Sequence, residues 1–131
     1  MVNNITLRFD QAKVKKVEED YKTLKVSAEQ RQLIDQIAQL MQNFLPLSVM
    51  AIKGNTWYTV KQWQEENHMT IGEIAQMNPQ DRFKTAKELF VLGKERMFHM
   101  LANPEEQKHL VDEVYDKAWK VYEQHVKQAN Q

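Results

Sequence analysis

Along most of this chain, apolar residues recur every three or four positions, which is the period of one face of an α-helix. Residues 10–25 follow this pattern with Val14, Val17, Tyr21 and Leu24. Residues 27–45 carry a wider apolar stripe, made by Leu33, Ile34, Ile37, Leu40, Met41, Phe44 and Leu45. Ser27 and Gln30 have the spacing of a capping box, and Pro46 ends the second stripe. The pattern therefore predicts two successive amphipathic helices.

Two matching helix-start signals organise the C-terminal part of the chain. Asn78-Pro79-Gln80-Asp81 and Asn103-Pro104-Glu105-Glu106 each place Asn at the N-cap, Pro at the first helical position and a carboxylate in the first turn. Apolar stripes then continue through residues 79–102 and 104–129. Because so short a connection joins the two segments, they predict a long antiparallel helical hairpin.

Three segments are shorter or less regular. Residues 4–9 alternate apolar and polar side chains, which predicts a short extended N-terminal segment. Residues 46–58 contain the turn dipeptide Gly54-Asn55, so they are expected to form either a small hairpin or a loop over the core. Residues 60–67 and 70–77 have the apolar spacing of two short helices.

Composition places the chain among single-domain helical proteins. Its 131 residues suit one domain, residues 1–131, and its 3 Gly and 3 Pro supply little material for the many turns of an all-β fold. We therefore expect an all-α fold, a small helical bundle that ends in the 79–102 and 104–129 hairpin. The chain has no cysteine, and no signal peptide or membrane span is evident, so a cytoplasmic location is expected.

No motif in the sequence carries recognisable catalytic chemistry. Two Glu-x-x-His pairs, Glu65–His68 and Glu106–His109, have the spacing that di-iron bundles use, but other helices supply no obvious inward Glu. These pairs are interpreted as solvated charges near helix ends. We expect a protein that is not an enzyme and that needs no metal or cofactor.

Residues 60–77 can also be drawn as a helix-turn-helix, with 70–77 as the recognition helix. The core positions of this arrangement are then occupied by Trp63, Met69, Ile74 and Met77. The segment resembles the start of excisionase-type DNA-binding proteins. Against this alternative, 70–77 has no Arg or Lys for phosphate or guanine, and the chain balances 18 basic against 18 acidic residues. Nucleic acid is therefore not the expected partner.

The sequence has more large apolar side chains than a thin helical pair can bury. Residues 79–102 are apolar around much of their circumference, and the helices at 10–25 and 27–45 are expected to cover part of them. The excess can be core, or a surface that binds an apolar helix or a sister subunit, and the two interpretations are compatible. The candidate interaction surface comprises Trp57, Tyr58, Trp63, Phe90, Met97, Phe98, Met100 and Trp119.

In size, element order and composition the chain resembles the tail assembly chaperones of long-tailed bacteriophages. The extended segment Asn4-Ile5-Thr6-Leu7-Arg8-Phe9, placed before helices rich in Lys, Glu and Gln, fits that family. The resemblance implies binding to the apolar helical tape-measure protein, self-association into an oligomer, and a location in the host cytoplasm. The alternatives are the helix-turn-helix regulator and a small immunity or inhibitor protein.

Overall fold

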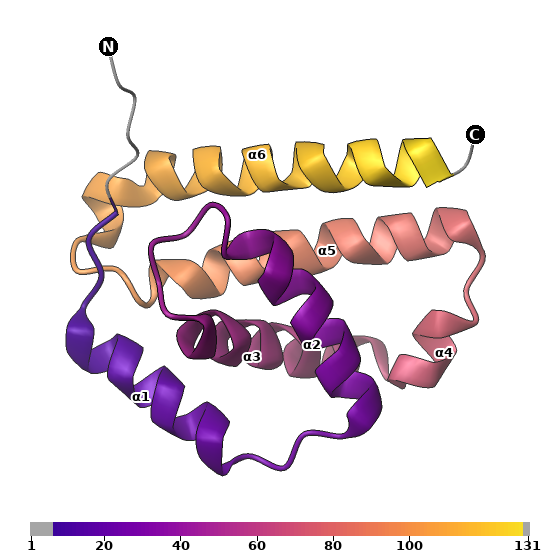
Figure 1. Cartoon of the computed structure of the whole chain (residues 1–131), viewed down its shortest axis with the longest axis horizontal. Helices are drawn as coiled ribbons and strands as arrows, with labels where there is room; N and C mark the ends of the chain where they lie inside the picture. The colour runs from indigo at the N-terminus through magenta and orange to yellow at the C-terminus, as the bar shows by residue number, and fades with distance from the viewer. Residues whose placement is uncertain (1–6, 130–131) are drawn as a thin grey trace.

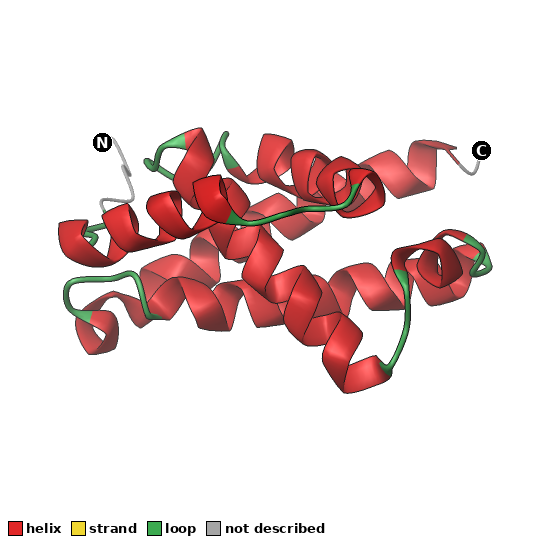
Figure 2. Cartoon of the chain, turned by 90° about the horizontal axis from the view of Figure 1, so that it is seen from below, coloured by secondary structure: helices red, strands yellow, loops and turns green. Residues whose placement is uncertain are grey.

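The computed structural model describes residues 7–129, and the regular structure in that range is a set of six α-helices (Figure 1). They are α1 (Gln11–Thr23), α2 (Ala28–Met41), α3 (Val49–Asn67), α4 (Ile71–Ala75), α5 (Pro79–Phe98) and α6 (Pro104–Ala129). Short loops join them, as Figure 2 shows. The predicted all-α bundle is confirmed, and α5 and α6 form the predicted antiparallel hairpin.

Most helices begin at the predicted residues because polar side chains cap them. Ser27 Oγ accepts from the Gln30 backbone N–H at 3.1 Å, and the Gln30 side chain accepts from the Ser27 N–H at 3.2 Å. Asn78 Oδ1 likewise accepts from the Asp81 N–H at 2.9 Å. Each cap satisfies a backbone donor that has no partner within the first helical turn.

The N-terminal extended segment finds its partner at the corner between α5 and α6. Residues 4–6 lie outside the described range, but Phe9 forms an antiparallel bridge with Leu101. The Asp10 N–H donates to the Met100 carbonyl at 2.8 Å, and the Ala102 N–H donates to the Arg8 carbonyl at 2.9 Å. This pairing takes up residues at the end of the predicted helix 79–102, and α5 accordingly ends at Phe98.

Both interpretations of residues 46–58, hairpin and loop, are wrong. Ser48 caps a single helix, α3, that runs for 19 residues through the Gly54-Asn55 dipeptide. Gly54 is present because α1 crosses α3 there. A Cβ at Gly54 would lie 2.5 Å from Val17 Cγ1 and 3.0 Å from the Val17 carbonyl oxygen. The glycine permits close helix packing rather than a turn.

This longer α3 becomes the centre of the bundle. α1 and α2 pack chiefly against α3, while α5 lies between α3 and α6 and packs against both (Figure 1). α3 and α6 provide most of the cover of α5. The helices at 10–25 and 27–45 contribute as well, since Val14 and Met41 belong to the apolar cluster that contains Phe90, in line with the expectation that they cover part of α5. The large share of α3 follows from its N-terminal half, which was not expected to be helical.

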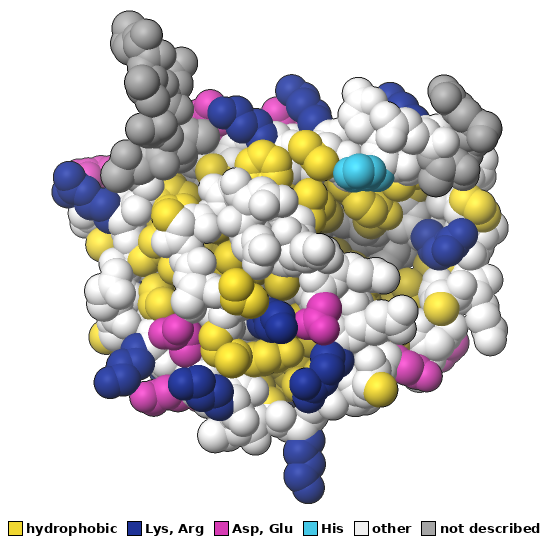
Figure 3. All heavy atoms as spheres, in the orientation of Figure 1, with side chains coloured by type: hydrophobic (Ala, Val, Ile, Leu, Met, Phe, Trp, Pro, Cys, Tyr) yellow, Lys and Arg dark blue, Asp and Glu magenta, His cyan; other side chains and the backbone are white. Residues whose placement is uncertain are grey.

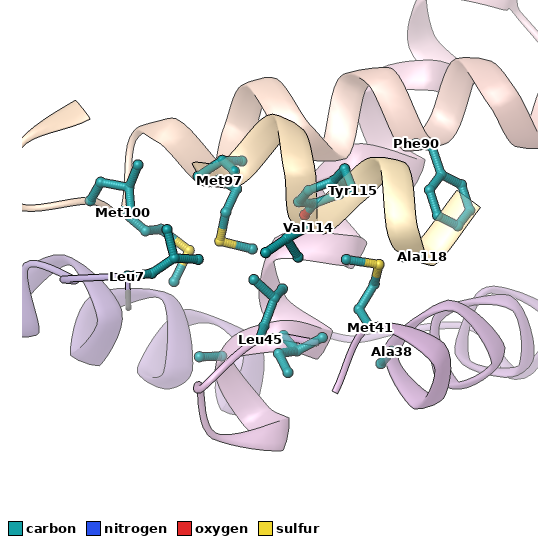
Figure 4. Close-up of a cluster of buried hydrophobic side chains, with 14 of the residues drawn as sticks. Leu7, Ala38, Met41, Leu45, Phe90, Met97, Met100, Val114, Tyr115 and Ala118 are labelled. Atoms are coloured by element: carbon teal, nitrogen blue, oxygen red, sulfur yellow. The ribbon is translucent and has the colours of Figure 1, made fainter. Parts of the chain in front are cut away.

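Two apolar clusters fill the interior. The larger one joins α5 and α6 to the N-terminal segment and the end of α2, and Figure 4 shows Met97, Met100 and Leu7 at one end of it, with Phe90 and Met41 at the other. The second cluster lies under α2 and α4, and its buried members are Ile34, Trp57, Val60, Trp63 and Leu89. None of the helices described in residues 7–129 combines the length and apolar character that a membrane crossing needs.

Candidate functional site

A groove of about 580 Å³ opens between α2 on one side and the α5–α6 hairpin on the other. It is visible in Figure 3 as a hollow beside α2, in the half of the molecule that holds the C-terminal end of α6. The lining residues are Leu33, Gln36, Ile37, Gln39, Leu40, Asn43, Ala86, Leu89, Phe90, Val121, Tyr122 and His125. The groove is larger and more apolar in its lining than the hollow beside it that reaches α4.

The groove exists because α2 rests on α3 and makes little contact with the hairpin. α2 packs extensively along α3 but meets α6 only briefly. Three members of the α2 stripe, Leu33, Ile37 and Leu40, consequently remain half-buried and face the gap. These side chains have the i, i+4, i+7 spacing of one helix face, so they form a continuous apolar wall.

An aromatic cluster holds the opposite wall in place. The Phe90 ring centre lies 5.2 Å from that of Trp119 and 6.0 Å from that of Tyr122, and Phe83 lies 5.0 Å from Trp119. Edge-to-face and tilted contacts at these distances stabilise a pair beyond its buried area. The wall formed by Phe90 and Tyr122 is therefore preformed by packing between α5 and α6.

A second hollow of about 430 Å³ continues the groove toward α4. Five residues line both hollows: Leu33, Gln36, Ala86, Leu89 and Tyr122. Together the hollows follow the chain from Glu29 on α2 to Asn43, two residues past the end of that helix, a length of roughly 21 Å at 1.5 Å per residue. That length corresponds to about four turns of an α-helix.

The polar groups of the groove are mostly uncharged. Gln36, Gln39 and Asn43 lie along its α2 edge, and His125 lies on the α6 side. Lys, Arg, Asp and Glu are absent from the described residues that line the larger hollow, and the second hollow adds Glu29 and Arg82. Burial raises the pKa of Tyr122, against the opposing effect of Arg82, so this phenol stays protonated at neutral pH. The groove offers amides, a phenol and apolar side chains.

Most residues of the predicted interaction surface lie in the interior of the structure. Six of its eight residues are buried in the two clusters: Trp57, Trp63, Phe90, Met97, Met100 and Trp119. Tyr58 and Phe98 are half-buried. Of the eight, Phe90 is the one that lines the groove. These large side chains went to the interior because α3, as a full helix, supplies partners for them.

The groove residues on α2 and α6 lie on apolar stripes that the sequence shows, but those stripes did not lead to a prediction of an interaction site. The α2 stripe is wider than one packing partner requires, and Val121 and His125 follow the apolar spacing of α6. Val121 is 37% exposed, which is unusual for a large aliphatic side chain. The sequence feature that indicates the groove is therefore the width of the apolar stripe on α2, and not the presence of large aromatic residues.

In the helix-turn-helix alternative, residues 70–77 would form the recognition helix, and in the structure that helix is short. Trp63, Met69, Ile74 and Met77 do gather in one apolar cluster, as that alternative required. However, α4 spans five residues, and its Glu73 side chain accepts from the Thr70 N–H in a capping box. A recognition helix normally presents several side chains to the major groove, and α4 has one and a half turns for that task.

The two Glu-x-x-His pairs do not converge in the structure. His68 ends α3 in the left-handed conformation, with φ of 52°, and both pairs are solvent-exposed. Within residues 7–129, no three His, Asp or Glu side chains come together in a metal-binding arrangement.

Two tyrosines outside the groove make the free energy of unfolding depend on pH in the alkaline range. Burial, together with the hydrogen bond to Asp20, raises the pKa of Tyr58 to about 12, and burial also raises the pKa of Tyr115. Both phenols keep their protons to higher pH in the folded protein than in the unfolded chain, where the pKa is 10.0. The unfolded state therefore loses protons first as pH rises, and the folded state loses stability.

We expect the free energy of unfolding to be nearly constant just below pH 10 and to fall steadily between pH 10 and 12. Urea denaturation followed by circular dichroism across this range measures the slope. Tyr58→Phe should make the fall shallower, since it removes one of the three tyrosines whose pKa is raised, the others being Tyr115 and Tyr122. An unchanged slope in that variant would assign the effect to other groups.

Comparison of the chain with protein-family models, with curated proteins and with solved structures gives no match.

Proposed function

We propose that this protein acts by binding another polypeptide, and that the α2–α5–α6 groove receives an apolar helical segment of that partner. The observation that carries the proposal is an open, largely apolar groove of about 580 Å³ with a preformed aromatic wall. Exposed apolar surface of this kind marks interaction sites in many proteins. A rigid wall also reduces the entropy lost on binding.

The shape of the groove favours a helix as its occupant. α2 forms one wall and the α5–α6 hairpin forms the other, so a further helix laid between them would complete the local bundle. The length of roughly 21 Å accommodates about 14 helical residues. Helices that dock in this manner place apolar side chains at i, i+3, i+4 and i+7 along the groove.

The glutamine-rich edge defines the chemistry of the partner more closely. Gln36, Gln39 and Asn43 can donate and accept hydrogen bonds, but they do not pair with a charge as a carboxylate or ammonium does. We expect an occupant with an apolar face bordered by uncharged polar residues. A charged flank would lose hydration against this edge without gaining an ion pair.

A tail assembly chaperone is the most specific version of this proposal. A client that is long, apolar and helical, such as a tape-measure protein, matches the groove, and the role needs no catalytic group. Self-association and a location in the host cytoplasm belong to the same version. Light scattering after size-exclusion chromatography tests the self-association, and a monomer at every concentration would contradict that part alone.

The binding proposal is tested with a fluorescein-labelled amphipathic helix of about 15 residues, built from Leu, Ala and Gln. Fluorescence anisotropy should report a dissociation constant of about micromolar order. Val121→Glu places a charge at an exposed position of the groove, and it should weaken binding by at least about tenfold. Gln36→Glu adds charge without removing apolar surface and should weaken binding less.

Val49→Glu is the matched control. Val49 is 46% exposed at the start of α3 and lies outside the groove, so the same substitution there should leave affinity unchanged. Equal weakening by Val121→Glu and Val49→Glu would show that net charge, and not the groove, controls binding. Absence of saturable anisotropy with the unmodified protein would overturn the helix-binding proposal itself.

A further inference from the structure

A separate hollow of about 200 Å³ lies where α1, the middle of α3 and the C-terminal end of α5 meet. Four basic side chains line it: Lys13 and Lys16 from α1, and Arg96 and His99 from α5. One carboxylate, Asp20, lies among them, together with the Tyr58 phenol. In a chain whose total charge is balanced, this is a local concentration of positive charge.

The cations of this hollow are not neutralised by ion pairs within the described residues. The five ion pairs found there join Lys53, Lys94, Lys117, Lys120 and Lys127 to acidic partners, and none includes Lys13, Lys16 or Arg96. Asp20 is already engaged, because its carboxylate accepts from the Tyr58 hydroxyl at 2.6 Å. The hollow therefore keeps a net positive charge.

Arg96 is held in a defined position. Its Nε donates to Gln62 Oε1 at 2.9 Å, and its guanidinium carbon lies 5.3 Å from the centre of the Tyr58 ring. These contacts fix the plane of the guanidinium and leave its terminal N–H groups available to an oxyanion. A preorganised guanidinium loses less conformational entropy when it binds a phosphate or carboxylate.

Lys13 occupies a position that helix stability alone disfavours. It is the third residue of α1, in the first turn, where the helix dipole favours acidic side chains and none is present. A basic residue at this end costs a few tenths of a kcal/mol. Departures from a local rule of this kind tend to mark functional positions.

From these observations we infer that the α1–α3–α5 hollow binds a phosphate group, as inorganic phosphate or at the end of a small phosphomonoester. A volume of about 200 Å³ is ample for a phosphate group, and the basic side chains lie on its walls. Lys13 and Lys16 supply charge from one side, and Arg96 supplies oriented donors from the other. This inference is independent of the helix-binding groove, because the two hollows share no lining residue.

The probe for the test is inorganic phosphate, titrated at constant ionic strength and followed by two-dimensional NMR of backbone amides. We expect saturable shifts confined to the hollow, with an affinity of about millimolar order for a few charge-assisted hydrogen bonds. The double variant Lys13→Gln/Lys16→Gln should weaken binding by about tenfold. Asp20→Asn should strengthen binding, because it removes the negative charge while an amide oxygen can still accept from Tyr58.

The double variant Lys15→Gln/Lys22→Gln is the matched control, since it removes the same charge from exposed positions of α1 that do not line the hollow. It should leave phosphate affinity within about twofold. Equal losses in both double variants, or shifts that vanish once ionic strength is fixed, would overturn the inference. Competition by short duplex DNA at lower concentration than phosphate would also overturn it, in favour of a nucleic-acid surface.

Discussion

Gly54→Ala should lower the free energy of unfolding by about 2–3 kcal/mol, although alanine is the better helix former. The added methyl group would lie 2.5 Å from Val17 Cγ1 and 3.0 Å from the Val17 carbonyl oxygen. The side-chain contact can be relieved by rotation, but the backbone contact requires α1 to move away from α3. That movement opens the packing of α1 along its principal partner.

Gly93→Ala is the control, because this glycine is also buried in a long helix at a helix crossing. A Cβ at Gly93 would find its nearest neighbours, on Tyr115 and Thr59, at 3.6 and 3.7 Å, which are ordinary van der Waals distances. The alanine should therefore be neutral or stabilise by up to about 1 kcal/mol, the helix-propensity difference. Urea denaturation of both variants gives the comparison. Two changes of the same sign and size would contradict the close α1–α3 packing.

Gly54 also marks the limit of what could be predicted from the sequence. The caps at Ser27 and Asn78 are local, since each involves a side chain and a backbone group three residues apart, and both were predicted correctly. The Gly54-Asn55 dipeptide has the local signature of a turn, but its structural role depends on α1, more than thirty residues earlier. Local patterns cannot reveal a glycine that is selected by another helix.

The same reason explains what the sequence showed of the candidate groove. The sequence shows a wide apolar stripe containing Leu33, Ile37 and Leu40, and its pattern predicts the hairpin opposite. Whether these surfaces meet or leave a gap depends on the angle at which α2 rests on α3. That angle is set by tertiary packing on α3, whose N-terminal half is not predicted as a helix by the local sequence pattern. The large aromatic residues predicted as an interaction surface either support the wall of the groove or lie elsewhere in the protein.

Trp63→Ala should be among the most destabilising single substitutions in this chain, at about 3–5 kcal/mol. Trp63 is 3% exposed in the second apolar cluster, and its indole Nε1 donates to Glu88 at 2.8 Å, which links α3 to α5. Four half-buried side chains around α4, Met69, Ile71, Ile74 and Met77, pack against the same cluster. Since α4 has no fully buried residue of its own, it should lose hydrogen-exchange protection first.

Trp63→Phe separates the two contributions of the indole. It keeps most of the apolar contact but removes the donor to Glu88, so a cost of about 1–2 kcal/mol is expected. Val91→Ala is the control for truncation at an exposed site, because Val91 is 44% exposed on α5, and it should change stability by less than about 0.5 kcal/mol. If Trp63→Ala cost no more than Val91→Ala, Trp63 would not support the cluster. Its expected place on an interaction surface would then regain support, because a large indole that contributes nothing to folding is free to contribute to binding.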